Sequence, residues 1–381
     1  MSKIKVNSLE GVGASTPAIS IDNASGTCTA NITNRSNRNK IINGGMIVSQ
    51  RQTSTTNSQA FVVDRFKAEV TQMDELVQTL EQSSDSPDGF SKSIKITTTT
   101  PESSVASNEQ FRIQTKLEGQ DFQDLAYGTS AAKTITISFY VKASVTGTFG
   151  FTVYRNESTP RVITAPYTIT TNDWERKTIT ISGDTVGAAI TNDNAERFRL
   201  MWGLAAGANF NTASASWGNY SSANLLGGHV TNSLVTTNNA TWQLAGVQLE
   251  VSDHATDFEH RSFGQELALC YRYYYRESIE NTEYFNGLGK ADSDGNSVDL
   301  NLKFPVTMRT TPTAVEQAGS GTNYLIRGSS TLQCTGVPTY GDATQHSATI
   351  RFTRSSHGIS TNNVANCGAW GASFLGFSAE L

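Results

Sequence analysis

The sequence is poor in the features that mark several large protein classes. Charged residues make up only 17% of its 381 residues, and the basic ones are scattered rather than gathered with aromatic residues, which argues against nucleic-acid binding. No run of about 18 apolar residues occurs, and the N-terminus lacks an apolar signal core. We therefore expect a protein that is made in the cytoplasm without a signal peptide and is not inserted into a membrane.

Cysteine and histidine are also sparse. The four cysteines, Cys28, Cys270, Cys334 and Cys367, lie far apart and form no CxxC pair, so the sequence favours buried free thiols over a zinc site. A bridge between Cys334 and Cys367 is left open. The five histidines show neither HExxH nor HxH spacing. The sequence accordingly predicts no metal site and no cofactor.

What the chain does contain is Ser, Thr, Asn and Gly in quantity, a composition typical of β-sandwiches with polar outer faces. In the clearest strand pattern, Ile135, Ile137, Phe139 and Val141 alternate with Thr and Ser. Residues 70–80 fit either a short helix or a bent strand. The strand patterns between Asn43 and His260 together predict a two-sheet jelly roll. These are Phe61–Phe66, Ser93–Thr98, Phe111–Leu117, Thr134–Ala143, Thr148–Tyr154, Arg176–Ile181, Glu196–Leu204 and Thr241–Val251.

The chain changes character near residue 258, where strand patterns give way to an aromatic helix pattern. The last strand is predicted to carry a bulge at Gly246. Ser262 and Gln265 form a capping box that opens a helix expected to run to Ser278. Its expected apolar face consists of Phe263, Leu267, Cys270, Tyr271 and Tyr274. After it, Val298–Phe304, Asn323–Arg327, Ala348–Thr353 and Ser373–Ala379 predict a smaller sandwich.

These patterns predict an all-β chain: a jelly-roll sandwich, a short linking helix and a smaller C-terminal β-sandwich, preceded by an extended N-terminal arm. The expected boundaries are residues 1–40 for the arm, 41–261 for the jelly roll, 262–280 for the helix and 281–381 for the C-terminal domain. The arm is too polar to fold alone. We expect it to dock on a partner chain through its few apolar residues, with docking on its own domain as the alternative. These residues are Ile4, Val6, Ile19 and Ile21.

Two aromatic sets are candidates for binding. Phe210, Trp217 and Tyr220 lie in a long Asn- and Ser-rich segment, and flat rings beside amide and hydroxyl groups suit a glycan. The alternative for Trp217 is that it plugs the end of the sandwich or a contact between subunits. Tyr273, Tyr274 and Tyr275 point to different sides of the expected helix, so at least one should face a neighbouring subunit. We identify no catalytic residue, because the carboxylates follow no recognisable pattern.

Several segments in series resemble a family of virion appendage proteins of tailed bacteriophages. They are INGGMIVSQR (Ile42–Arg51), FVVDRFK (Phe61–Lys67), Leu117–Val153, WERKTITISGDT (Trp174–Thr185) and Leu244–Arg276. The resemblance implies a jelly roll like that of carbohydrate-binding modules, assembled as a homotrimer in the virion. We hypothesise that such a protein attaches to other virion proteins through residues 1–40 and that it contributes to recognition of a host cell-surface glycan. A purely structural head or tail decoration protein is the alternative, and a glycan depolymerase is a further one.

Overall fold

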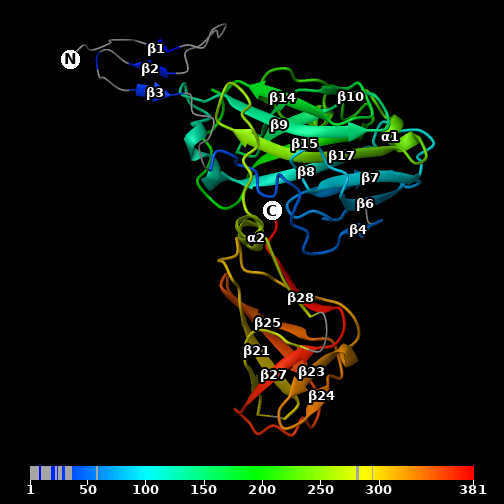
Figure 1. Cartoon of the computed structure of the whole chain (residues 1–381), viewed down its shortest axis with the longest axis vertical. Helices are drawn as coiled ribbons and strands as arrows, with labels where there is room; N and C mark the ends of the chain where they lie inside the picture. The colour runs from blue at the N-terminus through cyan, green and yellow to red at the C-terminus, as the bar shows by residue number, and fades with distance from the viewer. Residues whose placement is uncertain are drawn as a thin grey trace.

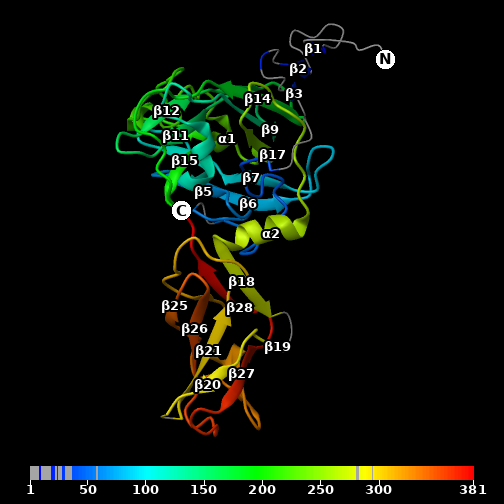
Figure 2. The same cartoon turned by 90° about the vertical axis from the view of Figure 1, so that its left-hand side faces the viewer.

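The computed structural model describes residues 8–9, 19–21, 24, 28–30, 37–56, 59–279, 283–293 and 295–381. Two β-domains follow one another along the long axis of the molecule, and helix α2 (Phe263–Tyr271) lies between them (Figures 1 and 2). Each domain has its own core of buried apolar side chains. The last described residues return to the junction between the domains, beside α2 (Figure 1).

The larger domain is a sandwich of two six-stranded antiparallel sheets. In order across the first sheet, the strands are β16 (Gly218–Asn219), β12 (Arg161–Thr164), β11 (Phe151–Arg155), β15 (Glu196–Ala206), β8 (Gln110–Glu118) and β5 (Lys67–Thr71). Across the second they are β14 (Glu175–Ile181), β9 (Ile135–Ala143), β17 (Thr241–Glu250), β7 (Ser93–Thr100), β6 (Val77–Ser83) and β4 (Ser54–Thr55). From β8 to β17 the long strands alternate between the two sheets, the connectivity of a jelly roll. The predicted all-β fold is therefore confirmed.

Alternating side chains explain how the sheets pack. On β9, Phe139 faces inward and meets Trp202 of β15 edge to face, with ring centroids 5.7 Å apart. Both rings are fully buried, and Phe66 and Phe151 contact the same indole. Aromatic pairs of this kind add to the stabilisation that burial of their area provides. Short pieces complete the domain: β10 (Gly147–Phe149) with β13 (Tyr167–Ile169), the 3-10 helices η1 (Gly119–Leu125) and η2 (Ser222–Asn224), and helix α1 (Ser233–Thr236).

Three local predictions are resolved by the structure. Residues 70–80 form neither the short helix nor one bent strand: β5 ends at Thr71, residues 72–76 cross to the other sheet, and β6 begins at Val77. The strand predicted at Phe61–Phe66 is wrong, because a turn closes there with Arg65 at φ +72°. The strand predicted at Thr148–Tyr154 is divided between β10 and β11, since the N–H of Gly150 donates to His229 Nδ1 (3.1 Å) instead of to a neighbouring strand.

The C-terminal domain is the smaller predicted sandwich. One sheet contains β18 (Tyr274–Ile279), β28 (Ser373–Ser378) and β22 (Glu316–Gln317). The other contains β24 (Thr331–Gln333), β23 (Tyr324–Arg327), β27 (Val364–Ala369), β20 (Gly289–Ala291), β21 (Ser297–Lys303), β26 (Ser347–Thr353) and β25 (Thr339–Ala343), with β19 (Glu283–Tyr284) paired to β27. The 3-10 helix η3 (Gly321–Asn323) precedes β23. Cys334 and Cys367 are buried free thiols here, as is Cys270 in α2.

The linking helix is shorter than predicted. Its capping box at Ser262 and Gln265 is confirmed, but the helix ends at Tyr271 and the following residues form β18. Its expected apolar face is only partly buried, because Phe263 is 57% exposed. Leu269, which lay outside that predicted face, is 39% exposed.

The three consecutive tyrosines were predicted to face a subunit interface because they were expected to be helical. The helix ends before them, at Tyr271, so that argument no longer applies. Tyr273, Tyr274 and Tyr275 are all buried within the chain itself. Arg65 lies 3.4 Å from the ring centre of Tyr273, and Arg51 lies 3.6 Å from that of Tyr274. The prediction assumed a helix, in which consecutive residues point to different sides, whereas these residues enter a strand paired with β28.

The N-terminal arm contributes a three-stranded antiparallel sheet of β1 (Ser8–Leu9), β2 (Ile19–Ile21) and β3 (Cys28–Ala30). Ile19 and Ile21 are half-buried in β2, while Ile4 and Val6 lie outside the described residues. Docking of the arm on a partner chain stays a prediction. None of the helices in the described part of the chain has the length and hydrophobicity required to span a bilayer.

Candidate functional site

A pocket of about 300 Å³ opens beside the start of α2, on the jelly roll. Three half-buried or exposed rings stand in it, those of Phe90, Phe258 and His260. The remaining lining residues are Gly45, Ile47, Gly89, Ser91, Arg261 and Glu266. Its volume is at the lower end of the range for small-molecule sites, so a ligand of about the size of one or two sugar rings would fill it.

Phe90 is carried by the turn of the β6–β7 hairpin. The N–H of Phe90 donates to the carbonyl of Pro87 (3.0 Å), and Gly89 has φ +85°. This backbone conformation suits glycine because side chains with a Cβ rarely adopt it. The hydroxyl of Ser86 also donates to the carbonyl of Phe90 (2.8 Å). The ring is therefore held on a rigid turn.

Phe258 and His260 are presented by the segment between β17 and α2. Two buried side chains of β17 fix that segment: Glu250 accepts from the N–H of Thr256 (2.8 Å), and Gln248 accepts from the N–H of Glu259 (2.8 Å). Because these contacts are made inside the domain, the wall of the pocket is held in place without a ligand. Preorganisation of this kind lowers the entropic cost of binding.

The rings form one cluster. The Phe90 centroid lies 4.9 Å from that of Phe258 and 5.2 Å from that of His260, and the Phe258 and His260 centroids are 4.9 Å apart. Phe90 also contacts Tyr140 of β9 (5.4 Å). The rings of Phe90 and Tyr140 lie over Gly246. A Cβ on this residue would come within 2.7 Å of Phe90 and 2.9 Å of Tyr140. The bulge predicted at this glycine is confirmed by the register shift between Ala245 and Gln248.

The polar residues that line the pocket form hydrogen bonds between two segments whose sequences resemble the phage family, Ile42–Arg51 and Leu244–Arg276. Arg261 donates to the carbonyl of Ile41 (2.9 Å) and lies 3.4 Å from Glu266 Oε1, which also accepts from the N–H of Asn43. The Ile42–Arg51 segment therefore lies against the residues around α2. Gly44 allows a close approach to β17: the N–H of Val247 donates to its carbonyl (2.9 Å), and a Cβ on Gly44 would lie 2.0 Å from the Val247 carbonyl oxygen.

The residues predicted for glycan binding lie elsewhere, and only two of the three share a cluster. Phe210 and Tyr220 pack on a small cluster around Met201, and Tyr220 meets Tyr154 edge to face at 5.0 Å. Trp217 instead packs against the main core, and its indole N–H donates to the carbonyl of Ser182 (2.9 Å). This placement favours the alternative in which Trp217 plugs the end of the sandwich. A glycan role for the three residues stays a prediction.

Sequence reasoning missed the pocket because its rings come from distant segments. A local signal did exist, since Phe90 follows a Pro-Asp-Gly turn and Phe258 and His260 stand in an otherwise charged turn, Asp257–Arg261. Aromatic residues in short polar turns have no place in a core formed by strands. That signal alone would not have paired the two turns.

No family model and no curated protein matches the chain. Similar solved structures include the enzymatically active domain of tailspike protein 4 of bacteriophage CBA120, at 10% identity and a TM-score of 0.31, over 56% of this chain and 22% of that one. This chain thus spans less than a quarter of the tailspike chain.

Two further similar structures are sugar-related. One is a putative sugar-binding protein of Bacteroides thetaiotaomicron, at 11% identity and a TM-score of 0.32, over 56% of this chain and all of that one. The other is a family 11 carbohydrate-binding module of Clostridium thermocellum in complex with a tetrasaccharide, at 8% identity and a TM-score of 0.28, over 54% and 99%. At these scores the similarity supports no conclusion about function, and membership of the phage family stays a prediction.

Proposed function

We propose that this chain is a non-catalytic subunit of a bacteriophage appendage and that it binds glycan in the pocket of Phe90, Phe258 and His260. The observation that carries the binding role is the preorganised cluster of three rings beside charged groups. Aromatic faces cover the C–H surfaces of a sugar, while neighbouring polar groups bind its hydroxyls. The virion role rests on the sequence resemblance, with residues 1–40 as the attachment segment.

Removal of the aromatic faces is expected to weaken glycan binding. On a glycan array, the full chain should bind a defined set of saccharides, and Phe90→Leu combined with Phe258→Leu should weaken that binding at least about tenfold, the equivalent of 1.4 kcal/mol. Leucine keeps the position apolar and retains most of the volume, so folding should be retained. Phe263→Leu is the matched control, because this phenylalanine is 57% exposed and does not line the pocket. Equal loss in the control, or full binding by the double variant, would contradict the proposal.

Because the sequence resembles phage appendage proteins, the full chain is expected to be a homotrimer in solution. Three weak glycan sites on one trimer would raise avidity by about 10²–10⁴, so a small pocket in each subunit would suffice for attachment to a surface. Light scattering coupled to gel filtration measures the mass directly. A mass three times that of the chain supports the assembly, whereas a concentration-independent monomer contradicts it.

Two alternatives remain distinct from this proposal. A structural decoration protein would bind virion chains but no glycan on the array. A depolymerase would shorten the polysaccharide that it binds, which chromatography of the incubated glycan would reveal. Binding without shortening is the result that the proposal predicts.

A further inference from the structure

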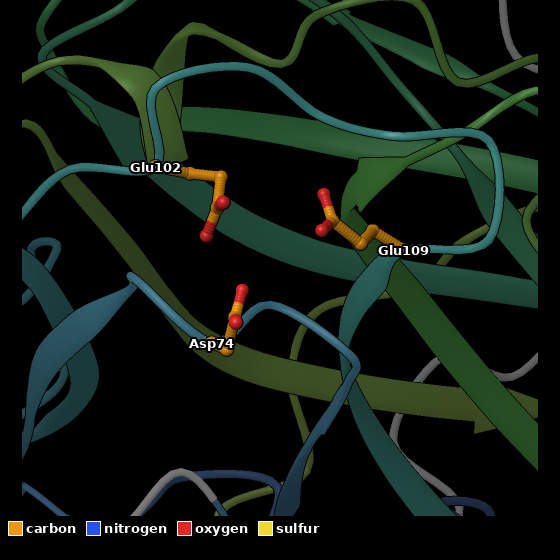
Figure 3. Close-up of side chains that lie close together, drawn as sticks. All are labelled: Asp74, Glu102 and Glu109. Atoms are coloured by element: carbon orange, nitrogen blue, oxygen red, sulfur yellow. The ribbon is translucent and has the colours of Figure 1, made fainter.

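Three carboxylates meet at one end of the jelly roll, away from the aromatic pocket. Asp74 lies in the connection between β5 and β6, and Glu102 and Glu109 lie at the two ends of the connection between β7 and β8. Figure 3 shows the three side chains pointing toward one another across the gap between these connections. One oxygen from each lies within 4.8 Å of the others. Asp74 is exposed, whereas Glu102 and Glu109 are only 4% and 7% exposed.

Among the described residues, no lysine or arginine forms an ion pair with any of the three carboxylates, so within that part of the chain no positive side chain balances the cluster. Burial raises the pKa of Glu102, and the negative charges of Glu109, Glu75 and Asp74 raise it further, against the smaller lowering effect of a hydrogen bond from the backbone of Leu76. Like charges held this close are unfavourable unless a proton or a cation neutralises them.

One carboxylate oxygen of the cluster, Glu102 Oε2, independently indicates that a ligand or an ion binds here. Glu102 Oε2 is inaccessible to solvent and accepts no hydrogen bond. A buried carboxylate oxygen without a partner costs free energy, so such atoms in a native fold call for a ligand or an ion. The backbone around it is fixed: the N–H of Glu102 donates to the carbonyl of Val235 (2.9 Å), and Glu109 Oε2 accepts from the N–H of Ala106 (2.7 Å). Glu102 is thus held pointing into the cluster.

We propose that Asp74, Glu102 and Glu109 form a Ca²⁺ site that ties the two connections together. The ligands are hard oxygens, which suit Ca²⁺ and Mg²⁺. Two oxygens that both contact Ca²⁺ at 2.3–2.6 Å lie at most about 5 Å apart, and for Mg²⁺ at 2.1 Å about 4.2 Å. The oxygens lie within 4.8 Å of one another, which is inside the limit for Ca²⁺, and Ca²⁺ accepts irregular sets of oxygen ligands whereas Mg²⁺ requires a near-ideal octahedron. Water on the exposed side of Asp74 would complete the 6–8 ligands of Ca²⁺.

Buried carboxylates of this kind do not suit polysaccharide cleavage. Glycosidases place two carboxylates about 5 Å or more apart on either side of a bound sugar. Here the two glutamates are buried, so a glycosidic bond could not come between them. A proton shared between the carboxylates would also neutralise their charge. Titration with metal ions distinguishes this explanation from a bound cation.

The test is titration calorimetry of the EDTA-treated full chain with CaCl₂ and, in parallel, MgCl₂, together with thermal unfolding. We expect one Ca²⁺ per chain, weaker Mg²⁺ binding, and a rise in Tm of about 5 °C when Ca²⁺ is at about 100 times its Kd. Glu102→Gln should weaken Ca²⁺ binding at least about tenfold and remove the rise in Tm. In EDTA the same variant should be at least as stable as the wild type, because it lacks a buried charge.

Glu75→Gln is the matched control, since Glu75 lies beside the cluster and contributes to its negative potential but is not one of the three ligands. It should keep Ca²⁺ binding within a few-fold. Unchanged Ca²⁺ binding by Glu102→Gln would place the ion elsewhere and overturn the proposal. So would the absence of Ca²⁺ binding together with an apo protein that gains stability as the pH falls toward 4.5, which is the signature of a shared proton.

Discussion

Asp184→Ala is expected to lower the stability of the jelly roll by about 5 kcal/mol, the upper end of the cost of breaking a buried ion pair. The Asp184 carboxylate binds Arg155 and also Arg161 Nε (2.6 Å), and its own side chain is 1% exposed. Because Arg155 is also 1% exposed and Arg161 9%, neither guanidinium can be rehydrated without movement of the fold. Urea unfolding monitored by tryptophan fluorescence measures the loss.

Asp193→Ala provides the comparison. Asp193 also pairs with an arginine, Arg197, but its side chain is 32% exposed and that of Arg197 is 22% exposed. Water can replace the lost partner there, so the loss should stay below about 1 kcal/mol. Equal losses in the two variants would mean that burial does not determine the contribution of the Asp184 network.

Glu118→Ala is expected to cost about 3 kcal/mol and to separate the unfolding of the two domains. Glu118 of β8 is fully buried at the domain junction and accepts two hydrogen bonds from Arg272 (both 2.7 Å) and one from the Tyr273 hydroxyl (2.5 Å). Burial raises the pKa of Tyr273, so its phenol stays protonated and donates. We place the cost at the lower end of the range for buried pairs because the Arg272 side chain is 29% exposed and can regain water.

Differential scanning calorimetry distinguishes local from joint unfolding. The wild type should unfold in one transition, since the junction also contains Arg309, whose side chain donates to the carbonyls of Ala379 (2.7 Å), Asn194 (3.1 Å) and Glu380 (2.7 Å). Glu118→Ala should give two transitions. Asp299→Ala, which removes an equally bidentate but exposed pair with Arg351, should leave the single transition in place. Two transitions already in the wild type would show that the junction does not couple the domains.

Much of the fold could be predicted because its determinants are local. Alternation in residues 135–141, the Gly246 bulge and the capping box at Ser262 each depend on a few consecutive residues. The end of α2 was not predictable in this way. Tyr274 leaves the helix because it pairs with Ser378 on β28, about a hundred residues later in the chain. A run of aromatic residues suits either state, so the distant pairing decides between them.

The candidate site was less predictable than the fold for the same reason. Phe90 and Phe258 meet only because β17 pairs with β7 and thereby brings the two turns together. The carboxylates of Asp74, Glu102 and Glu109 likewise come from two separate connections, and no motif spacing marks them. By contrast, Trp217 was singled out by its polar neighbours in the sequence, although its indole N–H already has a partner within the chain.

A crystal structure of the full chain with a saccharide identified on the array would show whether the pocket of Phe90, Phe258 and His260 binds glycan. We expect a sugar ring stacked on Phe90 or Phe258, with hydroxyl groups directed toward Arg261 and Ser91. A sugar bound instead at Tyr154 and Tyr220, or on the C-terminal sandwich, with an empty pocket, would contradict it.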